Sequence, residues 1–384
     1  MTANMALDHT PSRPAELTVA FLQHALTKAA SDDQASRGQR VVSFSWKPLE
    51  VGVISEVVAV QVQLQDETTN VLSSRELIAK FLRPEFPFER MFVVESNFYK
   101  GFSSSDAKRR FPFALPSAVF LSKQLIVMER VDAIATHSCV DGCPQDQILN
   151  VVCKLAQMHG RFWNTDCSEL SPSAGIGSEL TEQAKCQSFP QCWQSFLDDV
   201  PLGDEEQILV ARMCEKLSEK PAQLARIHDA VASGPTTLIH GDFHTANLMF
   251  PQSSAPPTNT VWLVDWATCG AGNPMRDLAF LFIVGVRSDH RAAMEATAIQ
   301  LYFETIRKEG VTHLSIDDWK RQYRMCVLNQ LLILAVYDSL SKQLANNAKS
   351  EKLRQELHAH FREVNVRACR ASLEHFDENE VAQL

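Results

Sequence analysis

Hydrophobic positions in the first third of the chain follow two different periods. Residues 17–30 have helical spacing, and a polar segment, SDDQASRGQR, follows them. The period then changes to two, because VVSFSW, EVVAVQVQL and ELIAKFL alternate apolar and polar side chains as half-buried β-strands do. Residues 89–102 suit a helix, and SAVFL and LIVME predict a hairpin across Ser122–Gln124. The pattern predicts an α+β unit with a small antiparallel five-stranded sheet over residues 1–131.

Helical periodicity dominates from residue 132 to residue 384. A first helix is marked by apolar positions and one histidine on a single face: Ile148, Val152, Leu155, His159 and Phe162. A loop rich in Ser, Pro and Gly occupies residues 166–178. Ser315-x-x-Asp318 resembles a capping box that opens a long helix. A final helix carries the stripe Leu353, Leu357, Phe361, Val364 and Ala368. We therefore expect a larger, mainly helical second unit, with the cleft between the units as the default ligand site.

Composition narrows the classes of partner. The chain has 384 residues and a net charge of −9, without a Lys/Arg-rich block, so a nucleic-acid partner is not expected. The N-terminus lacks a cationic segment followed by an apolar one, and the apolar runs at residues 278–286 and 331–336 are too short to span a bilayer. These features predict a cytoplasmic protein without a membrane segment.

The 10 cysteines show no framework spacing, which favours reduced thiols. The pairs Cys139–Cys143 and Cys186–Cys192 could in principle bind metal. Neither has a second Cys/His pair at zinc spacing, so structural zinc is disfavoured.

The stretch LIHGDFHTANLMF, residues 238–250, carries the candidate chemistry. Its apolar end and the later run VWLVD enclose a turn-rich loop and predict an antiparallel hairpin. Asn247 enters the first strand and Asp265 leaves the second, so both should lie at the same end, with Asp242 on the loop before them. An amide oxygen and a carboxylate are hard ligands for Mg²⁺, and a further carboxylate can accept a hydroxyl proton. The combination predicts phosphoryl transfer.

The spacing His240-x-Asp242-x-x-x-x-Asn247 is that of the kinase catalytic loop H-R-D-x-x-x-x-N, with Asp265 in the place of the D-F-G aspartate. Gly241 replaces the Arg, Trp266 and Ala267 replace Phe-Gly, and no A-P-E follows. Only about ten residues separate Asp265 from Asp277, which leaves no room for an activation loop. A protein kinase is therefore disfavoured.

Together, HGDFHTANLMF and VWLVDWATCGAGNPMRDLAF resemble the aminoglycoside phosphotransferase and choline-kinase-like superfamily. The spacing in the first unit is similar to that of its ecdysteroid-kinase-like (CHK-type) branch. The resemblance implies a two-lobed protein-kinase-like fold, with ATP and Mg²⁺ as cofactors and a small-molecule alcohol as substrate. It further implies that Asp242 is the catalytic base or substrate-orienting carboxylate, and that Asn247 and Asp265 bind Mg²⁺.

The resemblance also assigns residues of the first unit to the nucleotide. Lys80 would contact the α- and β-phosphates, and Glu95 would pair with it. The segment WKPLEVGVISEV would be the phosphate-covering turn, with Ser55 near the β-phosphate, although it has one glycine where three are typical. Backbone groups near Glu129 and Val131 would read the adenine edge.

Two of these residues are also constrained by their neighbours in the sequence. Lys80 and Glu95 both lie among apolar residues, so each is costly to bury unless the two pair. Trp266 could floor a substrate pocket, but core packing is the simpler interpretation.

The histidines and Asp277 have supporting roles in this interpretation. His240 and His244 have the i, i+4 spacing of zinc ligands on a helix, but Gly241 argues against a helix there. His240 is expected to orient the loop, while His244 could face substrate or phosphate, or could be structural. His159 reads as a core histidine, and Asp277 as a helix cap or a brace of the loop.

The sequence thus predicts an ATP- and Mg²⁺-dependent small-molecule kinase. The alternative is a nucleotide-binding pseudokinase or scaffold, whose signature would be the loss of Lys80, Asp242, Asn247 or Asp265. All four are present. The acceptor, the preference for ATP or GTP and the oligomeric state stay open.

Overall fold

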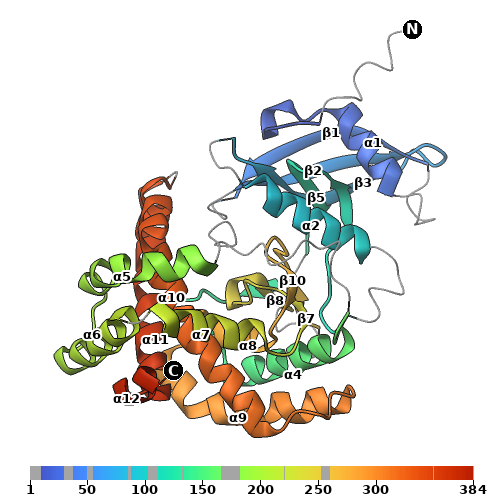
Figure 1. The fold of residues 1–384 in the computed structure, drawn as a ribbon. Helices are drawn as coiled ribbons and strands as arrows, with labels where there is room; N and C mark the ends of the chain where they lie inside the picture. The colour runs from blue at the N-terminus through green and yellow to red at the C-terminus, as the bar shows by residue number, and fades with distance from the viewer. Residues whose placement is uncertain are drawn as a thin grey trace. The chain divides into compact units, whose positions relative to one another are not determined.

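The computed structural model of the chain describes residues 10–29, 38–49, 55–84, 88–102, 111–131, 134–165, 182–219, 221–251, 260–348 and 350–383. The chain divides into two compact units (Figure 1). The sheet unit comprises Met1–Arg109 and Ala114–Ile134, and the helical unit comprises Arg110–Phe113 and Ala135–Leu384. The predicted loop at residues 166–178 and the turn around Gly52 lie outside the described residues.

An antiparallel five-stranded sheet forms the centre of the sheet unit, in the order β1-β2-β3-β5-β4. Its strands are β1 (Gln39–Pro48), β2 (Ser55–Asp66), β3 (Leu72–Leu82), β4 (Ala118–Leu121) and β5 (Leu125–Glu129). Two helices accompany it, α1 (Val19–Ala29) and α2 (Glu89–Gly101), after a 3₁₀ turn at Pro14–Glu16. The strands, both helices and the β4–β5 hairpin confirm the elements predicted from periodicity.

The alternation within β2 and β3 separates the two faces of the sheet. Odd-numbered β3 residues enter a hydrophobic core shared with α1, whose members include Val58, Val60, Leu77, Ala79, Phe81, Leu22 and Leu26. Because neighbouring strand residues point to opposite faces, Lys80 points away from this core. The Lys80 side chain instead points toward α2, where it forms an ion pair with Glu95.

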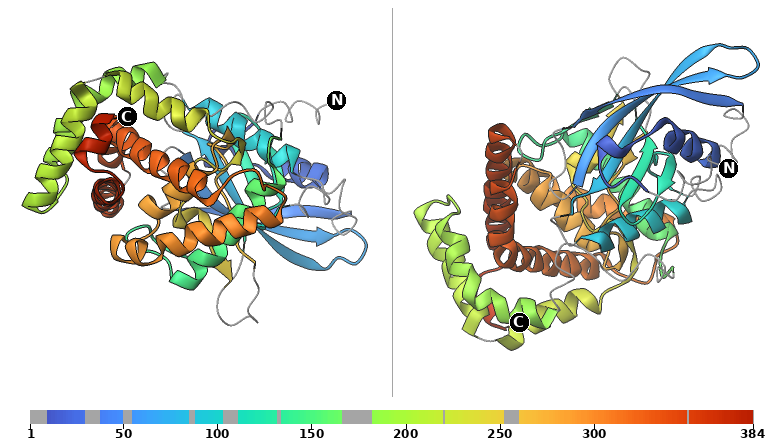
Figure 2. Two further views of the ribbon diagram at one scale, coloured as in Figure 1. Left: turned by 60° about the horizontal axis from the view of Figure 1, so that its bottom comes forward. Right: turned by 90° about the horizontal axis from the view of Figure 1, so that it is seen from above.

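Nine helices lie in the described part of the helical unit. They are α4 (Gln145–Arg161), α5 (Glu182–Asp198), α6 (Asp204–Glu219), α7 (Pro221–Ala232), α8 (Met275–Val284), α9 (Ser288–Lys308), α10 (Ile316–Asn346), α11 (Glu351–His375) and α12 (Glu378–Gln383). Helix α10 packs against α8 and α11, and α4 packs against α9 (Figure 2).

The predicted helix signals of this unit are confirmed. Ser315 and Asp318 form a complete capping box at the start of α10. The five positions that marked the first helix in the sequence are all buried; four lie in α4 and the fifth, Phe162, is its C-cap. In α11, Val364 and Ala368 are buried, whereas the earlier stripe positions are half-buried.

Short strands frame the central stretch of the sequence. β8 (Leu248–Pro251) and β9 (Trp262–Leu263) form the expected antiparallel hairpin, with Leu248 opposite Leu263. β6 (Ile134–Thr136) adds an unpredicted third strand, and β7 (Thr237–Ile239) pairs with β10 (Gly270–Gly272). The second strand of this hairpin is shorter than the apolar run VWLVD, because β9 covers only Trp262–Leu263. The ladder stops at Leu263, just before the backbone turns into a left-handed conformation at Asp265.

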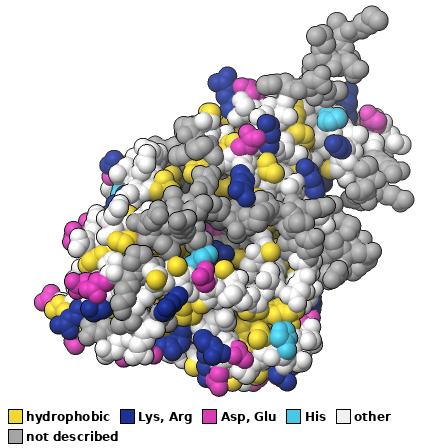
Figure 3. Space-filling model, in the orientation of Figure 1, with side chains coloured by type: hydrophobic (Ala, Val, Ile, Leu, Met, Phe, Trp, Pro, Cys, Tyr) yellow, Lys and Arg dark blue, Asp and Glu magenta, His cyan; other side chains and the backbone are white. Residues whose placement is uncertain are grey.

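Within the described helices, no segment is both long and apolar enough to cross a bilayer. Charged side chains of both signs are interspersed on the face drawn in Figure 3. The eight cysteines whose side chains the structure describes are free thiols.

Candidate active site

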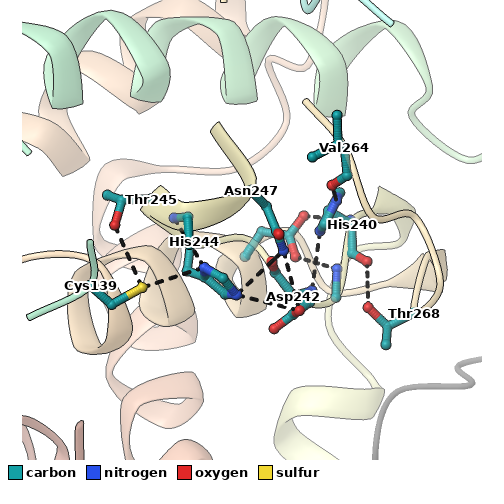
Figure 4. A network of polar contacts seen from close by, with 11 residues as sticks. Cys139, His240, Asp242, His244, Thr245, Asn247, Val264 and Thr268 are labelled. Carbon is teal, nitrogen blue, oxygen red and sulfur yellow. Dashed lines mark hydrogen bonds and ion pairs between the residues drawn. The ribbon is translucent and has the colours of Figure 1, made fainter. Parts of the chain in front are cut away.

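The loop from His240 to Asn247 connects β7 to β8 and ends in a short 3₁₀ turn, Thr245–Asn247 (Figure 4). Gly241 has φ +84°, and a Cβ atom there would lie 2.4 Å from the Thr268 carbonyl oxygen. The Thr268 hydroxyl also donates to the His240 carbonyl at 3.0 Å. Only glycine therefore allows this close approach of two backbone segments.

Asp277, in the first turn of α8, braces the start of the loop. Its carboxylate accepts from the backbone N–H of His240 at 2.7 Å and of Gly241 at 2.8 Å. No side-chain bond caps α8, so of the two predicted roles the structure shows bracing. Burial by itself raises the pKa of Asp277, but His159, 3.4 Å away, and the His240 contacts hold that pKa below its ordinary value. His159 is fully buried, and its Nδ1 lies 2.8 Å from the Tyr302 hydroxyl.

His240 is buried and orients the loop through both ring nitrogens. Nε2 lies 3.0 Å from the Val264 carbonyl, and Nδ1 accepts from the Asp242 N–H at 3.3 Å. This pairing requires the proton on Nε2. Burial lowers the pKa of His240 and favours that neutral form. The ring packs against fully buried Trp266, with centroids 4.6 Å apart, so Trp266 is a core residue.

Asn247 and Asp242 are joined within the loop. The Asn247 amide nitrogen donates to the Asp242 carbonyl at 3.0 Å and to its carboxylate at 3.2 Å. Because the nitrogen is used in this way, the amide oxygen Oδ1 is directed elsewhere. The Asp242 side chain keeps about a third of its surface exposed, 31%. A carboxylate and an amide oxygen are therefore both presented at the end of β8.

Asp265 lies at the same end of the hairpin. The backbone N–H of Val264 donates to the Asn247 carbonyl at 3.1 Å, so Asp265 follows a residue bonded directly to Asn247. Its φ of 64° is left-handed, which is uncommon outside glycine. Such strained residues cluster at functional sites, and this one is half-buried.

His244 contacts Asp242 as well as the loop backbone. Its Nε2 lies 3.4 Å from the Asp242 carboxylate, and its Nδ1 lies 3.2 Å from the Ala246 backbone nitrogen. Burial alone lowers the pKa of His244, but the Asp242 carboxylate outweighs it and raises that pKa well above 6.5. In return, His244 more than offsets the effect of burial and lowers the pKa of Asp242 to about 2. These contacts hold His244 within the loop, and a substrate-facing or phosphate-facing role stays a prediction.

Two further residues support the loop: Cys139, which the sequence analysis considered only as a possible metal ligand, and Arg367, which it did not single out. Cys139 follows β6 and places its sulfur 3.5 Å from His244 Nδ1. Arg367, on α11, is fully buried and donates to the carbonyls of Cys139, Val140 and Val284 at 2.6–3.0 Å. These contacts span 83 to 228 positions of the chain, so local spacing does not predict them.

In the sheet unit, Lys80 and Glu95 form the ion pair expected from their apolar neighbours. The Lys80 ammonium lies 2.8 Å from the Glu95 carboxylate, and the side chains are 15% and 1% exposed. The Phe92 ring centroid is 5.7 Å from the same ammonium. Ser55 is the buried first residue of β2, opposite Leu82. The turn before it, residues 50–54, lies outside the described residues.

Glu129 ends β5, and Val131 follows two residues later. The Glu129 N–H donates to the Ser117 carbonyl at 2.9 Å, and its carboxylate lies 2.6 Å from the Arg75 guanidinium. Reading of a base edge by backbone groups near Glu129 and Val131 stays a prediction.

The two-unit α+β fold and the histidine–aspartate–asparagine loop define a kinase-like phosphotransferase. Residues 52–315, more than half of the chain, match the model of the ecdysteroid kinase-like family. The chain belongs to this family, and it is a phosphotransferase that uses an alcohol group as acceptor. No curated protein matches it in sequence.

Solved structures resemble the chain only distantly. Macrolide 2'-phosphotransferase MphH from Brachybacterium faecium is 12% identical, with a TM-score of 0.45 over 88% of this chain and 97% of its own. Plasmodium vivax ethanolamine kinase is 9% identical, with a TM-score of 0.46 over 82% of this chain and 80% of its own. APH(2")-IIa, in its complex with gentamicin, is 13% identical, with a TM-score of 0.46 over 91% of this chain and 99% of its own. Likenesses this low say nothing about substrate or site.

Proposed function

We propose that the chain transfers the γ-phosphoryl group of ATP to a hydroxyl of a small molecule, with Mg²⁺ as cofactor. The observation that carries the proposal is the orientation of Asn247. Its amide nitrogen is committed to Asp242, which leaves the amide oxygen as a ligand beside the left-handed Asp265. One amide oxygen and one carboxylate, completed by phosphate oxygens, suit the preference of Mg²⁺ for a few hard protein ligands.

Asn247 and Asp265 would hold the metal, which, when bound, neutralises charge on the phosphates. Asp242 has a pKa of about 2, so it is ionised at neutral pH and is a weak base. Its role is therefore to accept a hydrogen bond from the acceptor hydroxyl and aim the oxygen. It takes the proton late, as bonding to phosphorus develops. His244, His240 and Asn247 hold the carboxylate in place, so little reorganisation is needed during the reaction.

Residues of the sheet unit would serve the nucleotide. Lys80, kept extended by Glu95, would contact the α- and β-phosphates, with Ser55 near the β-phosphate. The Glu129 carbonyl and the Val131 N–H would pair with the adenine edge. Support comes from the Lys80–Glu95 ion pair, because a lysine held by a buried carboxylate is preorganised for a phosphate. A cytoplasmic location stays a prediction.

A nucleotide-binding scaffold without turnover is the second candidate. The residues that such proteins lose, Lys80, Asp242, Asn247 and Asp265, are all present. No observation on the described residues favours the scaffold over the enzyme.

The direct test is the substitution Asp242→Asn, assayed with labelled ATP and a panel of neutral, cationic and anionic small alcohols. Phosphorylation of the preferred acceptor should fall about 10²–10⁴-fold, as expected for loss of a positioned acid–base group. Nucleotide binding, measured by calorimetry, should persist.

Asp289→Asn is the matched control, because Asp289 is an exposed residue of α9. It should keep full activity. A wild-type protein that binds nucleotide but phosphorylates nothing would support the scaffold, and full activity of Asp242→Asn would remove Asp242 from the reaction.

A further inference from the structure

We propose that Ser96 of α2 is a positioning residue for the nucleotide phosphates, which acts through Glu95 on Lys80. The inference rests on the proposed function, in which Lys80 contacts the α- and β-phosphates. It deepens that function because it assigns a role to a residue that no sequence motif marks. Ser96 holds the position of α2, and with it the carboxylate that keeps Lys80 in place.

The first observation is the face that α2 turns inward. Phe92, Glu95, Ser96 and Tyr99 have the spacing i, i+3, i+4, i+7, and all four are buried. The Glu95 carboxylate lies 2.8 Å from the Lys80 ammonium, and the Phe92 ring centroid lies 5.7 Å from it. Ser96 therefore lies on the same helical face as the two residues that contact Lys80.

The second observation is a bond that joins this face to the turn between β4 and β5. The Ser96 hydroxyl donates to the Ser122 carbonyl at 2.8 Å, and Ser96 is 2% exposed. An exposed ion pair between Lys123 and Glu89 joins the same turn to the start of α2. Exposed ion pairs contribute little, whereas a buried donor–acceptor pair is costly to break. Of these two contacts, the Ser96–Ser122 bond is therefore the one that fixes the helix.

The third observation is that the β4–β5 turn is itself fixed to the part of β3 that carries Lys80. In the ladder between β3 and β5, Lys80 lies opposite Ile126. Two residues further along β3, the Leu82 N–H donates to the Gln124 carbonyl at 2.9 Å. The Ser122 hydroxyl accepts from the Gln124 N–H at 3.3 Å, which keeps the turn closed. The carbonyl that holds α2 therefore has a fixed place relative to Lys80.

Together these contacts close a ring. It runs from Lys80 to Glu95, along α2 to Ser96, through the β4–β5 turn and back along β3 to Lys80. Removal of the Ser96 hydroxyl opens the ring, so that α2 loses a buried restraint against turning or sliding relative to β3. The attraction between the Lys80 ammonium and the Glu95 carboxylate weakens as they separate. The lysine then loses the partner that keeps it extended, and the loss appears in the binding of phosphate groups.

The test measures the affinity of the full chain for ADP and Mg²⁺ by calorimetry, which needs no acceptor. Ser96→Ala removes the hydroxyl, Glu95→Gln removes the carboxylate, and the double variant removes both. Gln23→Ala is the matched control. Gln23 of α1 bonds to the backbone of β1 at Val41 and Gln39, and α1 packs against the face of the sheet opposite to Lys80.

For Ser96→Ala, the Kd for ADP should rise about fivefold, the weight of one uncharged hydrogen bond. In the Glu95→Gln background the same substitution should change the Kd by less than about twofold, because the residue through which Ser96 acts is already altered. In the acceptor assay the KM for ATP should rise with the Kd, while the KM for the alcohol should stay at the wild-type value. Gln23→Ala should lower stability in urea and keep the wild-type affinity for ADP.

An unchanged Kd in Ser96→Ala, or an equal rise in the wild-type and Glu95→Gln backgrounds, would overturn the inference. An equal loss of affinity in Gln23→Ala would overturn it too, because Ser96 would then act only through the general stability of the sheet unit. The proposed function can fail separately. A wild-type protein that binds ADP but phosphorylates no alcohol would refute the enzyme and leave the assignment of Ser96 to be decided by the cycle on ADP, whereas a wild-type protein that binds no ADP would refute both.

Discussion

Single side chains explain why the loop can carry an ionised carboxylate in a half-buried position. Asp242 receives bonds from Asn247 and a charge contact from His244, while Asp277 fixes the backbone behind it. The two acidic residues therefore differ in role: Asp277 is buried and supports the loop backbone, whereas Asp242 is partly exposed and can meet a ligand.

Gly241 gives the sharpest prediction at this scale. Gly241→Ala should lower the free energy of unfolding by at least about 1 kcal/mol, because φ +84° disfavours a Cβ atom and the Thr268 carbonyl blocks it. Phosphorylation should fall further than stability accounts for, since the bonds from His240 and Gly241 to Asp277 would be disturbed. Denaturant titration and the acceptor assay measure both. Gly310→Ala, where φ is +100° but no atom lies within 4 Å, separates backbone strain from the clash. Equal effects at the two glycines would contradict the argument.

Lys80 gives a second prediction. Lys80→Met should reduce kcat/KM for ATP about 10²-fold, the loss typical of one preorganised charged donor. It should also destabilise the sheet unit, because buried Glu95 loses this cation. Adding Glu95→Gln should restore stability but not activity, and urea unfolding with ATP kinetics distinguishes the two. Lys47→Met, at an exposed β1 position, should change neither. Recovery of activity in the double variant would show that Lys80 has no role at the phosphates.

How much of the site could be predicted depended on distance along the chain. The Asp242–Asn247 contact spans five residues and follows from the motif. Arg367 reaches Cys139 across 228 positions, so the local pattern does not predict the contact. The contact between His244 and Cys139 could not be predicted either, because the two residues lie 105 positions apart.

At the scale of elements, three helices of the helical unit are tied together by a buried charged cluster. Glu295 of α9 accepts from the Tyr323 hydroxyl of α10 and lies 3.0 Å from His375 Nε2 of α11. Arg291, fully buried, lies 3.4 Å from the same carboxylate. Burial by itself raises the pKa of Glu295, but His375 and Arg291 bring it below 4.5.

Because the pKa of Glu295 is lowered in the folded protein, the free energy of unfolding should depend on pH. Because the folded pKa of Glu295 is lower than the unfolded one, its contribution to stability is present above about pH 4.5 and is lost as the pH falls. Glu295→Gln should therefore cost about 3 kcal/mol at pH 7 and less at pH 4, measured by urea unfolding at each pH. Glu304→Gln, at an exposed position of the same helix, is the control. A cost that stays constant with pH would rule out the ionised form.

Helices and strands were predicted correctly where they are long enough for the hydrophobic pattern to repeat several times. The strands of the sheet unit span up to 12 residues and show their alternation clearly. β6, β7 and β10 have three residues each, which is too short for any period, and their pairing depends on distant partners. The apolar run VWLVD is longer than β9 for a related reason, since its apolar residues continue the pattern after the ladder has stopped.

For the whole molecule, family membership gives the class of reaction. The dependence of stability on Mg²⁺ and a nucleotide can test the proposed metal site without a known acceptor. A non-hydrolysable ATP analogue at 100 times its Kd should add about 2.7 kcal/mol to the free energy of unfolding. EDTA should remove most of this gain, because Asn247 and Asp265 would act on the phosphates through the metal. Thermal unfolding with and without Mg²⁺ measures the effect, and Asp265→Asn should weaken the response to Mg²⁺. Stabilisation that persists in EDTA would contradict a bridging metal.

The left-handed backbone at Asp265 has a consequence for any saturation library at this codon. Glycine and asparagine tolerate φ 64° best among the alternatives, whereas valine and isoleucine do not. Selection for abundance alone should therefore retain a small set of side chains, and selection for turnover should retain aspartate from within that set. The difference between the two surviving sets isolates the demand for a carboxylate from the demand for a tight bend.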